Sequence, residues 1–147
     1  MDRKRELLRI ERERWVQFCE LVDRVPADRI DEQTLNPDGW SVKDLLWHIG
    51  SWDAEIAGEL KRVRLGTYLE HDWDTDATNA RFFEEGRRTD LATVRDVWRE
   101  EREHVLAEMT RVDEVTPPVE EWFSESAYKH MDDHLPELRR FVEEAPS

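Results

Sequence analysis

The sequence predicts an all-α fold, a bundle of four long helices, and three observations support that class. Apolar residues recur at helical spacing within long charged stretches. Only five glycines and six prolines occur, and most of them fall between those stretches, as loop residues do. No run of alternating apolar and polar residues stands out as a strand. The 147 residues are about one domain long, so we expect a single domain over residues 1–147.

The first helix is expected from about Asp2 to Val25. Its apolar stripe, drawn by turning successive residues through about 100°, consists of Leu8, Trp15, Cys19 and Val22. The charged runs RIERER in this helix and WREEREH in a later one are interpreted as solvated faces with weak i,i+4 pairs. Cys19 is the only cysteine, so no internal disulfide is possible. Its place on a core stripe predicts a raised thiol pKa and no catalytic role.

The second helix has a well-specified start. Ser41 is a natural N-cap, and Asp44 stands at the N3 position of a capping box. The helix is expected to continue to about Arg64, with Gly66 as its C-terminal stop. Its core stripe consists of Val42, Leu45, Ile49, Trp52, Ile56 and Val63. His48 lies at the margin of that stripe, where a side chain can face the bundle interior and still touch a water-filled opening.

The third region has two parts. The loop LEHDWDTD leads into a short helical segment around Ala77–Glu85. A longer helix is expected from near Asp90 to Val112. Its core stripe consists of Leu91, Val94, Trp98, Val105 and Met109.

The last helix follows a loop with two adjacent prolines. Ser124 is expected to cap this helix, which continues through Phe141 and beyond. Its core stripe consists of Ala127, Met131, Leu138 and Phe141. His130 and His134 lie along the edge of that stripe. Pro136 removes one backbone hydrogen bond, so a kink or local break is expected just past the second histidine.

Charge and hydropathy exclude several classes of partner. The formal net charge is −14 and the pI is near 4.8, so the average field repels nucleic acids and anionic lipid surfaces. The N-terminal segment MDRKRELLRIERERW is too charged for a secretory signal, and no stretch approaches the ~20 apolar residues of a membrane span. We therefore expect a cytoplasmic protein that acts on small molecules and binds neither nucleic acid nor membrane.

One face of the second helix is free of charge in a chain that is 39% charged. This small-residue stripe consists of Trp47, Gly50, Ser51, Ala54, Ala57 and Gly58. Small residues at this spacing let another helix approach closely. The stripe therefore predicts contact with a neighbouring helix or with a second subunit, and a homodimer is one expected outcome.

The spacing of three histidines indicates a possible metal site. His130 and His134 stand one helical turn apart, so both rings can reach one ion if a facing helix supplies a third ligand. His48 is the candidate, because it is the other histidine near a core-facing stripe. Three imidazoles suit Zn, Ni, Fe or Cu and leave positions open for water or substrate. On spacing alone, ordinary hydrogen-bonded histidines remain the alternative.

Two other motifs resemble metal sites but lack required parts. Glu101 and His104 form half of a di-iron signature, which needs a second such motif and two more glutamates. Asp72, Asp74 and Asp76 imitate the first half of a calcium loop that lacks the turn glycine and the final glutamate. We interpret the aspartate run as a solvated loop, with the alternative that it overhangs the histidine site.

The segments GWSVKDLLWHIGSWD and HMDDHLPEL resemble the DinB and YfiT-like superfamily of bacterial metal-binding four-helix bundles. In that family, G-W-S-x-x-[DE] at a helix start precedes the first histidine ligand, and H-x-x-x-H late in the last helix supplies the other two. His48 matches the first ligand, and His130 and His134 match the others. The resemblance implies the DinB/YfiT-like four-helix fold and a divalent Zn, Ni or Fe ion on three histidines. It covers the whole chain in architecture, although the middle matches only loosely.

The activities that this resemblance implies are broad. They include bacillithiol-dependent S-transferases, mycothiol-dependent isomerases and proteins that inactivate toxic metabolites. We therefore expect a metal-dependent enzyme that uses a low-molecular-weight thiol on a small electrophile, as an S-transferase or isomerase. The alternative is a stress-response protein that binds or sequesters a small molecule with the same triad and without turnover. No segment of the sequence selects one thiol or one substrate.

Overall fold

The computed structural model describes residues 2–144, and every regular element in that range is helical. The elements are α1 (Arg3–Asp23), the 3₁₀ turn η1 (Ala27–Arg29), α2 (Val42–Leu65), α3 (Thr75–Arg87), α4 (Leu91–Arg111), α5 (Pro117–Ser124), the π-helical segment η2 (Glu125–Lys129) and α6 (His130–Glu143). The predicted all-α class is confirmed. Within this part of the chain, no helix combines the length and apolar character needed to cross a bilayer.

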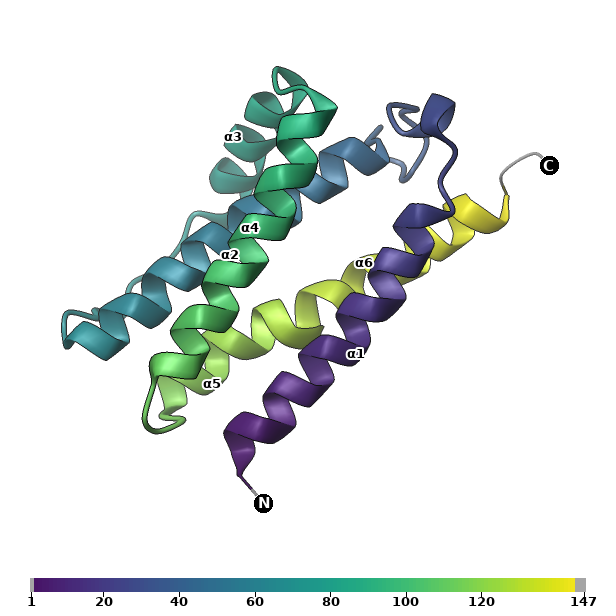
Figure 1. Cartoon of the computed structure of the whole chain (residues 1–147). Coiled ribbons are helices and arrows are strands. Elements are labelled where there is room, and N and C mark those ends of the chain that lie inside the picture. The colour runs from purple at the N-terminus through teal and green to yellow at the C-terminus, as the bar shows by residue number, and fades with distance from the viewer. Residues whose placement is uncertain (1, 145–147) are drawn as a thin grey trace.

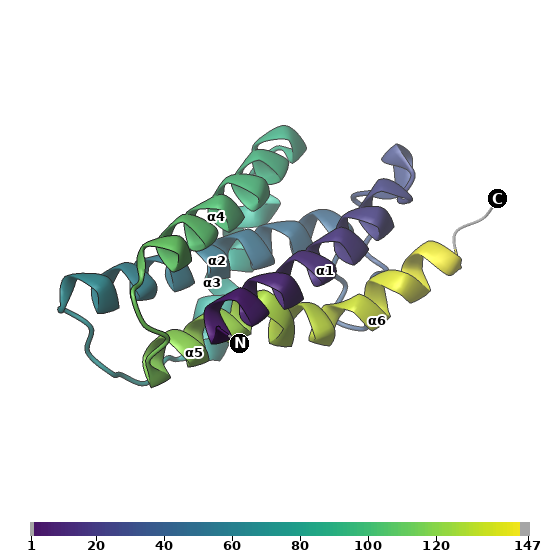
Figure 2. The same cartoon turned by 60° about the horizontal axis from the view of Figure 1, so that its bottom comes forward.

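The long helices lie in two pairs. Helix α2 runs beside α4, and α1 runs beside α6 and η2 (Figure 1). Helix α3 packs against α2, and α5 contacts α2 before the chain enters η2. The view turned by 60° shows the same two pairs (Figure 2). Residues from α2 and from the last helical stretch therefore face one another across the molecule.

The predicted caps of α2 are confirmed. The backbone N–H of Asp44 donates to Ser41 Oγ at 3.1 Å, and the N–H of Ser41 donates to Asp44 Oδ2 at 2.8 Å. Gly66 ends the helix with a φ of 75°, a conformation that glycine adopts without strain. Arg87 of α3 donates from Nε to Asp44 Oδ1 at 3.1 Å. The start of α2 is thus held both by its own cap and by the end of α3.

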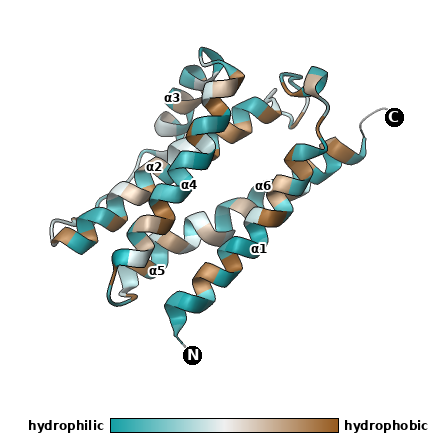
Figure 3. Ribbon diagram, viewed as in Figure 1, coloured by the Kyte–Doolittle hydropathy of each residue, from teal (hydrophilic) through white to brown (hydrophobic). Residues whose placement is uncertain are grey.

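The apolar core forms two clusters along the bundle, and hydrophobic residues recur at intervals along each long helix (Figure 3). The first cluster includes Phe18, Leu45, Ile49, Trp98, Met131 and Leu138. The second cluster includes Leu7, Ile56, Leu60, Val105, Met109, Phe123 and Ala127. Each of α1, α2 and α4 contributes residues to both clusters, so these helices run past the boundary between them.

Buried polar residues occur where the helices pass from one cluster to the other. Arg102 of α4 donates two hydrogen bonds to Glu11 of α1, from Nε to Oε2 at 2.8 Å and from Nη2 to Oε1 at 2.9 Å. Ser126 of η2 donates from Oγ to Asp53 of α2 at 2.8 Å. Glu11 is only 3% exposed, and Asp53 and Ser126 are buried. We call these four residues the polar layer.

The polar layer corrects the interpretation of the charged runs as solvated faces. That interpretation is wrong at Glu11 and Arg102, which belong to the runs RIERER and WREEREH. The guanidinium of Arg102 also lies over the ring of Trp15, at 4.4 Å from its centroid. A doubly hydrogen-bonded arginine with an aromatic partner satisfies a buried carboxylate that would otherwise lack compensation for lost water.

The predicted stripe of α1 is only partly correct. Val22 is buried, but Leu8, Trp15 and Cys19 are only partly buried. The buried face instead consists of Leu7, Glu11, Phe18, Leu21 and Val22. The buried face of the helix thus includes Glu11, whose carboxylate pairs with Arg102 of α4.

The start of the last helical stretch also differs from prediction. Ser124 does not cap it, since α5 already begins at Pro117 and has proline in its first positions, where no backbone N–H is needed. The chain then passes through η2 into α6 without a loop. Pro136 lies inside α6, and the helix continues past it without a break. Asp132 and Pro136 are exposed, so water can solvate the carbonyl that the proline leaves unpaired.

The small-residue stripe of α2 contacts neighbouring helices, which is one of the two outcomes predicted for it. A side chain at Gly50 would place its Cβ 3.0 Å from the Cα of Trp98, so α4 approaches closely there. A Cβ at Gly86 of α3 would meet the ring of Trp47 at 2.8 Å. Ala54 is exposed. The homodimer stays a prediction.

Arg102→Ala should lower the free energy of unfolding by about 3 kcal/mol, because it leaves the Glu11 carboxylate buried without its partner. Arg9→Ala is the matched control, since Arg9 pairs with Glu13 on the exposed surface. Its effect should stay within about 0.5 kcal/mol. Urea unfolding followed by circular dichroism measures both variants. Equal effects would show that the buried pair has no special role.

Candidate metal centre

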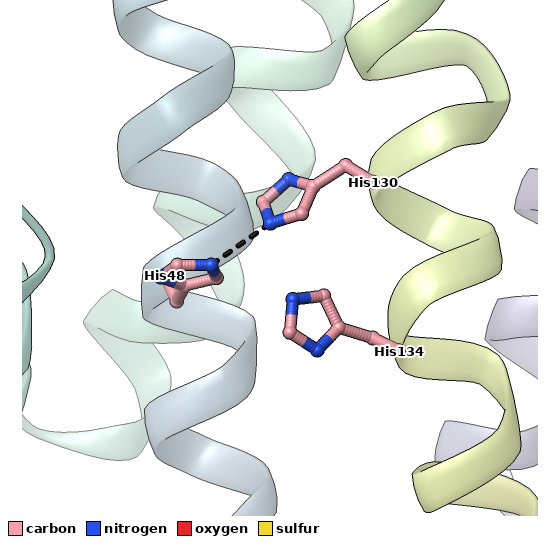
Figure 4. Close-up of side chains that lie close together, drawn as sticks. All are labelled: His48, His130 and His134. Carbon is pink, nitrogen blue, oxygen red and sulfur yellow. Dashed lines mark hydrogen bonds between the residues drawn. The ribbon is translucent and has the colours of Figure 1, made fainter. Parts of the chain in front are cut away.

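The structure brings His48, His130 and His134 together. His48 lies in the second turn of α2, and the two other histidines lie one turn apart at the start of α6. His48 Nε2 and His130 Nε2 are 2.8 Å apart. One ring nitrogen from each of the three histidines lies within 4.8 Å of the other two (Figure 4). The sequence-based expectation that the three rings meet is therefore correct in geometry.

These separations suit a shared ion. Two nitrogens bound to one tetrahedral zinc ion are about 3.3 Å apart, given Zn–N bonds of about 2.05 Å. The Nε2 atoms of His48 and His130 lie closer together than that spacing, whereas 4.8 Å, the upper limit on the separation of the ligand nitrogens, is longer than it. Small rotations of the side chains would make the nitrogen–nitrogen distances equal. No other group of three or more potential ligands is this close within residues 2–144.

The surroundings keep the imidazoles of His48 and His130 uncharged. Burial, with a smaller contribution from the neighbouring His134, lowers the pKa of His48 to about 3. Burial also lowers the pKa of His130 well below its ordinary value, with His48 and then His134 adding to the effect. A neutral imidazole keeps the lone pair that a metal needs, so the environment that disfavours the proton favours metal binding.

Residues around the triad orient the rings. Glu137, three residues after His134, lies 2.8 Å from His134 Nδ1, which leaves Nε2 for the other two histidines. A carboxylate in that position fixes the ring and strengthens a ligand. Trp40 stacks on His134 with centroids 6.3 Å apart and meets His48 edge-on at 4.9 Å. The spacing of Glu137 from His134 is the signal that could have identified this carboxylate from the sequence.

A cavity of about 540 Å³ opens beside the triad. Besides the three histidines, it is lined by Trp40, Trp52, Ile56, Trp73, Thr75, Asn79, Glu121, Trp122, Glu125 and Asp133. Its size matches that of a typical small-molecule site. Trp73 and Thr75 lie within the aspartate-rich loop and line the cavity, whereas Asp72, Asp74 and Asp76 are exposed, so the aspartates are solvated as expected while the loop borders the cavity. Open space next to three converging imidazoles is what a metal site needs if it is also to bind a substrate.

The other candidate ligands lie outside the cluster. His104 is exposed and its Nδ1 lies 3.1 Å from Glu101 Oε2. His71 is exposed, with Nδ1 3.0 Å from the carbonyl of Leu69. Asp74 caps α3 by accepting from the N–H of Ala77 at 3.1 Å. These groups have structural partners and do not form a second metal site.

Cys19 lies in a separate groove that it shares with Trp15, Asp23 and Arg102. Burial, with a smaller contribution from Asp23, raises the pKa of its thiol to about 11. The expectation of a raised pKa is thus confirmed. Arg102 and Arg99 lower the pKa of the thiol, but their effect is smaller than that of burial. Cys19 is protonated at neutral pH and unsuited to act as a nucleophile.

Asp53 connects α2 to the segment that precedes His130. It is buried, and its hydrogen bond from Ser126 joins the two elements. Burial, with a smaller contribution from the charge of Glu11, raises the pKa of Asp53 to about 7. This residue could not be identified from the sequence, because one aspartate among 36 acidic residues has no local signature of burial.

Comparison with known proteins identifies one family. The sequence profile of the family described as "Mycothiol maleylpyruvate isomerase N-terminal domain" matches residues 11–145. That range includes all three histidines and nearly the whole chain. Searches of curated proteins and of solved structures found no significant match.

His130→Ala and His134→Ala should each abolish stoichiometric zinc binding, because each removes one of three converging nitrogens. His104→Ala is the matched control and should bind normally, since His104 is exposed and outside the cluster. Calorimetric titration of untagged protein gives the stoichiometry. Binding should weaken as the pH falls, because protons compete for the same lone pairs. Equal binding in the three variants would contradict the site.

Asp53→Asn should change the pH dependence of stability in a defined direction. Folding raises the pKa of Asp53 from 3.8 to about 7, so the stability of the wild type falls as the pH rises from 3.8 to 7. The variant lacks this loss. Its stability relative to wild type should therefore rise through that window, by at most about 1.4 kcal/mol per pH unit, and level off above it.

Urea unfolding at pH 5, 7 and 8.5 with a chelator present measures this difference. His48 titrates alike in both proteins, so its contribution cancels. Asp113→Asn, on the exposed surface, is the control and should follow the wild-type profile. A constant difference between Asp53→Asn and wild type would show that Asp53 is ionised throughout in the folded protein.

Proposed function

The chain belongs to the mycothiol maleylpyruvate isomerase N-terminal domain family, within the DinB/YfiT-like superfamily, and on this premise we propose that it is a metal-dependent, thiol-using enzyme. The reaction we propose is S-transfer to a small electrophile or isomerisation of one. The observation that supports this most directly is the meeting of three histidines at the edge of a cavity. The family name supports mycothiol, or a similar low-molecular-weight thiol, as the co-substrate.

His48, His130 and His134 would hold a divalent ion such as Zn, Ni or Fe. Such an ion supplies open coordination positions and stabilises a thiolate at neutral pH. Burial supports this role by disfavouring the protonated forms of His48 and His130. Glu137 keeps Nδ1 of His134 engaged and so directs its other nitrogen toward the shared point.

The remaining groups support binding rather than covalent chemistry by the protein. The cavity wall carries no cysteine within residues 2–144, and Cys19 lies in a different groove. The nucleophile in our proposal therefore comes from the external thiol. Trp40 and Trp52 cover part of the cavity and exclude water from the space beside the histidines.

We also propose the four-helix arrangement of the DinB/YfiT-like type for the fold. In this description α5, η2 and α6 together form the last helix, since no loop interrupts them. Helices α1, α2 and α4 supply the other three, and α3 is an addition that packs on α2.

A binding protein with the same triad and no turnover is the second candidate. The aromatic wall of the cavity favours it, because several large rings around one space can retain an apolar ligand without any reaction. Ligand-dependent melting without thiol consumption would support this alternative.

Turnover should require the triad and not the protein thiol. With any substrate found by screening electrophiles against mycothiol and related thiols, Cys19→Ala should keep most of the wild-type rate. His48→Ala or removal of metal with a chelator should reduce the rate by at least about 100-fold. Thiol consumption is the measurement. An inactive Cys19→Ala together with an active chelated protein would overturn the proposal.

A further inference from the structure

Three tryptophans form a continuous aromatic wall on the cavity. The ring of Trp73 lies 5.4 Å from that of Trp52 and 6.1 Å from that of Trp122, centroid to centroid. These rings come from α2, from the segment before α3 and from α5, so three separate parts of the chain converge. Trp40 stands apart from this wall, against the histidines.

Hydrogen bonds hold two of these rings in place. Trp52 Nε1 donates to Asn79 Oδ1 at 2.8 Å, and Trp122 Nε1 donates to the hydroxyl of Tyr68 at 3.2 Å. A tryptophan whose indole N–H is engaged has a fixed orientation and a preorganised ring face. Little conformational freedom is then lost when a ligand binds against it.

The charged residues of the cavity are all acidic. Glu121, Glu125 and Asp133 line it, and no lysine or arginine does so in the described part of the chain. The one cation paired with these carboxylates is Lys129, whose Nζ lies 3.8 Å from Glu125 Oε1 with both side chains about half exposed. That distance and exposure make a weak pair. The whole chain adds a formal charge of −14.

From this combination we propose that the cavity selects a substrate with a cationic head, an organic ammonium group, on an apolar or aromatic body. The inference rests on the proposed function and names the substrate class of the same site. Indole faces attract cations through their ring quadrupole, most strongly for tryptophan, and nearby carboxylates add Coulomb attraction. Both effects act in the same direction.

The same wall disfavours anionic substrates. A carboxylate entering the cavity would lose water near three acidic side chains and find no lysine or arginine among the described lining residues. Maleylpyruvate, the compound in the family name, is a dicarboxylate at neutral pH. The described side chains that line the cavity therefore disfavour that compound, for which the ion on the triad would be the attracting charge.

Three phenols that differ mainly in head-group charge test the proposal: tyramine, neutral 4-ethylphenol and anionic 4-hydroxyphenylacetate. Each is titrated calorimetrically at pH 7 into the full chain, once with zinc and once with a chelator. Tyramine should bind about fivefold more tightly than 4-ethylphenol. The acid should bind more weakly than both. The inference is overturned if, in the chelated protein, the acid binds at least as tightly as tyramine or 4-ethylphenol equals tyramine, because zinc can bind the carboxylate of the acid directly.

Variants assign the selectivity to the wall. Glu125→Gln should weaken tyramine binding about threefold and leave 4-ethylphenol unchanged. Glu103→Gln is the matched control, since Glu103 is exposed and lines the other groove, and it should change neither. Trp73→Leu keeps an apolar side chain without the indole, so it should bring tyramine and 4-ethylphenol to similar affinities. Unchanged tyramine preference in both cavity variants would overturn the assignment.

The outcomes separate this inference from the proposed function. Zinc stoichiometry and thiol consumption report on the triad, while the ranking of the three phenols in the chelated protein reports on the cavity wall alone. A triad without metal or turnover would overturn the function and leave the ranking to be judged separately. A chelated protein that prefers the anion would overturn the inference and, if zinc binds stoichiometrically in its own titration, leave the metal site standing.

Discussion

The hydrogen bond between Ser126 and Asp53 is the interaction on which the site depends. It joins α2 to the segment just before α6, in the interior of the molecule. Asp53 lies five residues after His48, and Ser126 lies four residues before His130, so the two elements run antiparallel. Because the contact between Asp53 and Ser126 fixes these two elements against each other, it also places His48 opposite His130. The histidines meet because a buried polar contact one turn away sets the alignment of the helices.

The interior satisfies its ionisable groups in two different ways. Glu11 receives two hydrogen bonds from Arg102, so its charge is matched by a fixed partner. Asp53 has only the hydroxyl of Ser126, and burial raises its pKa to about 7. His48 behaves like Asp53 in this respect, since burial favours its uncharged form. Charge pairing stabilises the contact between α1 and α4, while suppression of charge near the cavity leaves donor atoms available for a metal.

Local signals in the sequence predicted the local structure well. The capping box of Ser41 and Asp44 and the stop at Gly66 are encoded within a few residues, so α2 could be bounded without knowledge of the rest of the chain. The start of α5 at Pro117 was also encoded locally, but the proline pair was assigned to a loop. The histidine site could be inferred because helical spacing and a family resemblance agreed on the same three positions.

Features that depend on a partner elsewhere in the chain could not be predicted in this way. Glu11 and Arg102 have the same composition and spacing as the exposed charges beside them, and only the packing of α1 on α4 distinguishes them. The aromatic wall could not be predicted either, because Trp52, Trp73 and Trp122 are far apart in sequence. The irregular segment η2 carries no recognisable local signature.

The π-helical segment η2 corrects a mismatch of helical phase. Twelve residues of regular α-helix leave Met131 rotated by about 120° from Val119, yet both side chains are buried. A π turn accommodates one extra residue and takes back roughly 100° of that rotation. Deletion of a single residue here would leave eleven residues of ordinary helix between Val119 and Met131, which keeps the histidine edge in phase with α5 to within about 20°. The π turn is therefore the form in which this helix holds one residue more than its alignment needs.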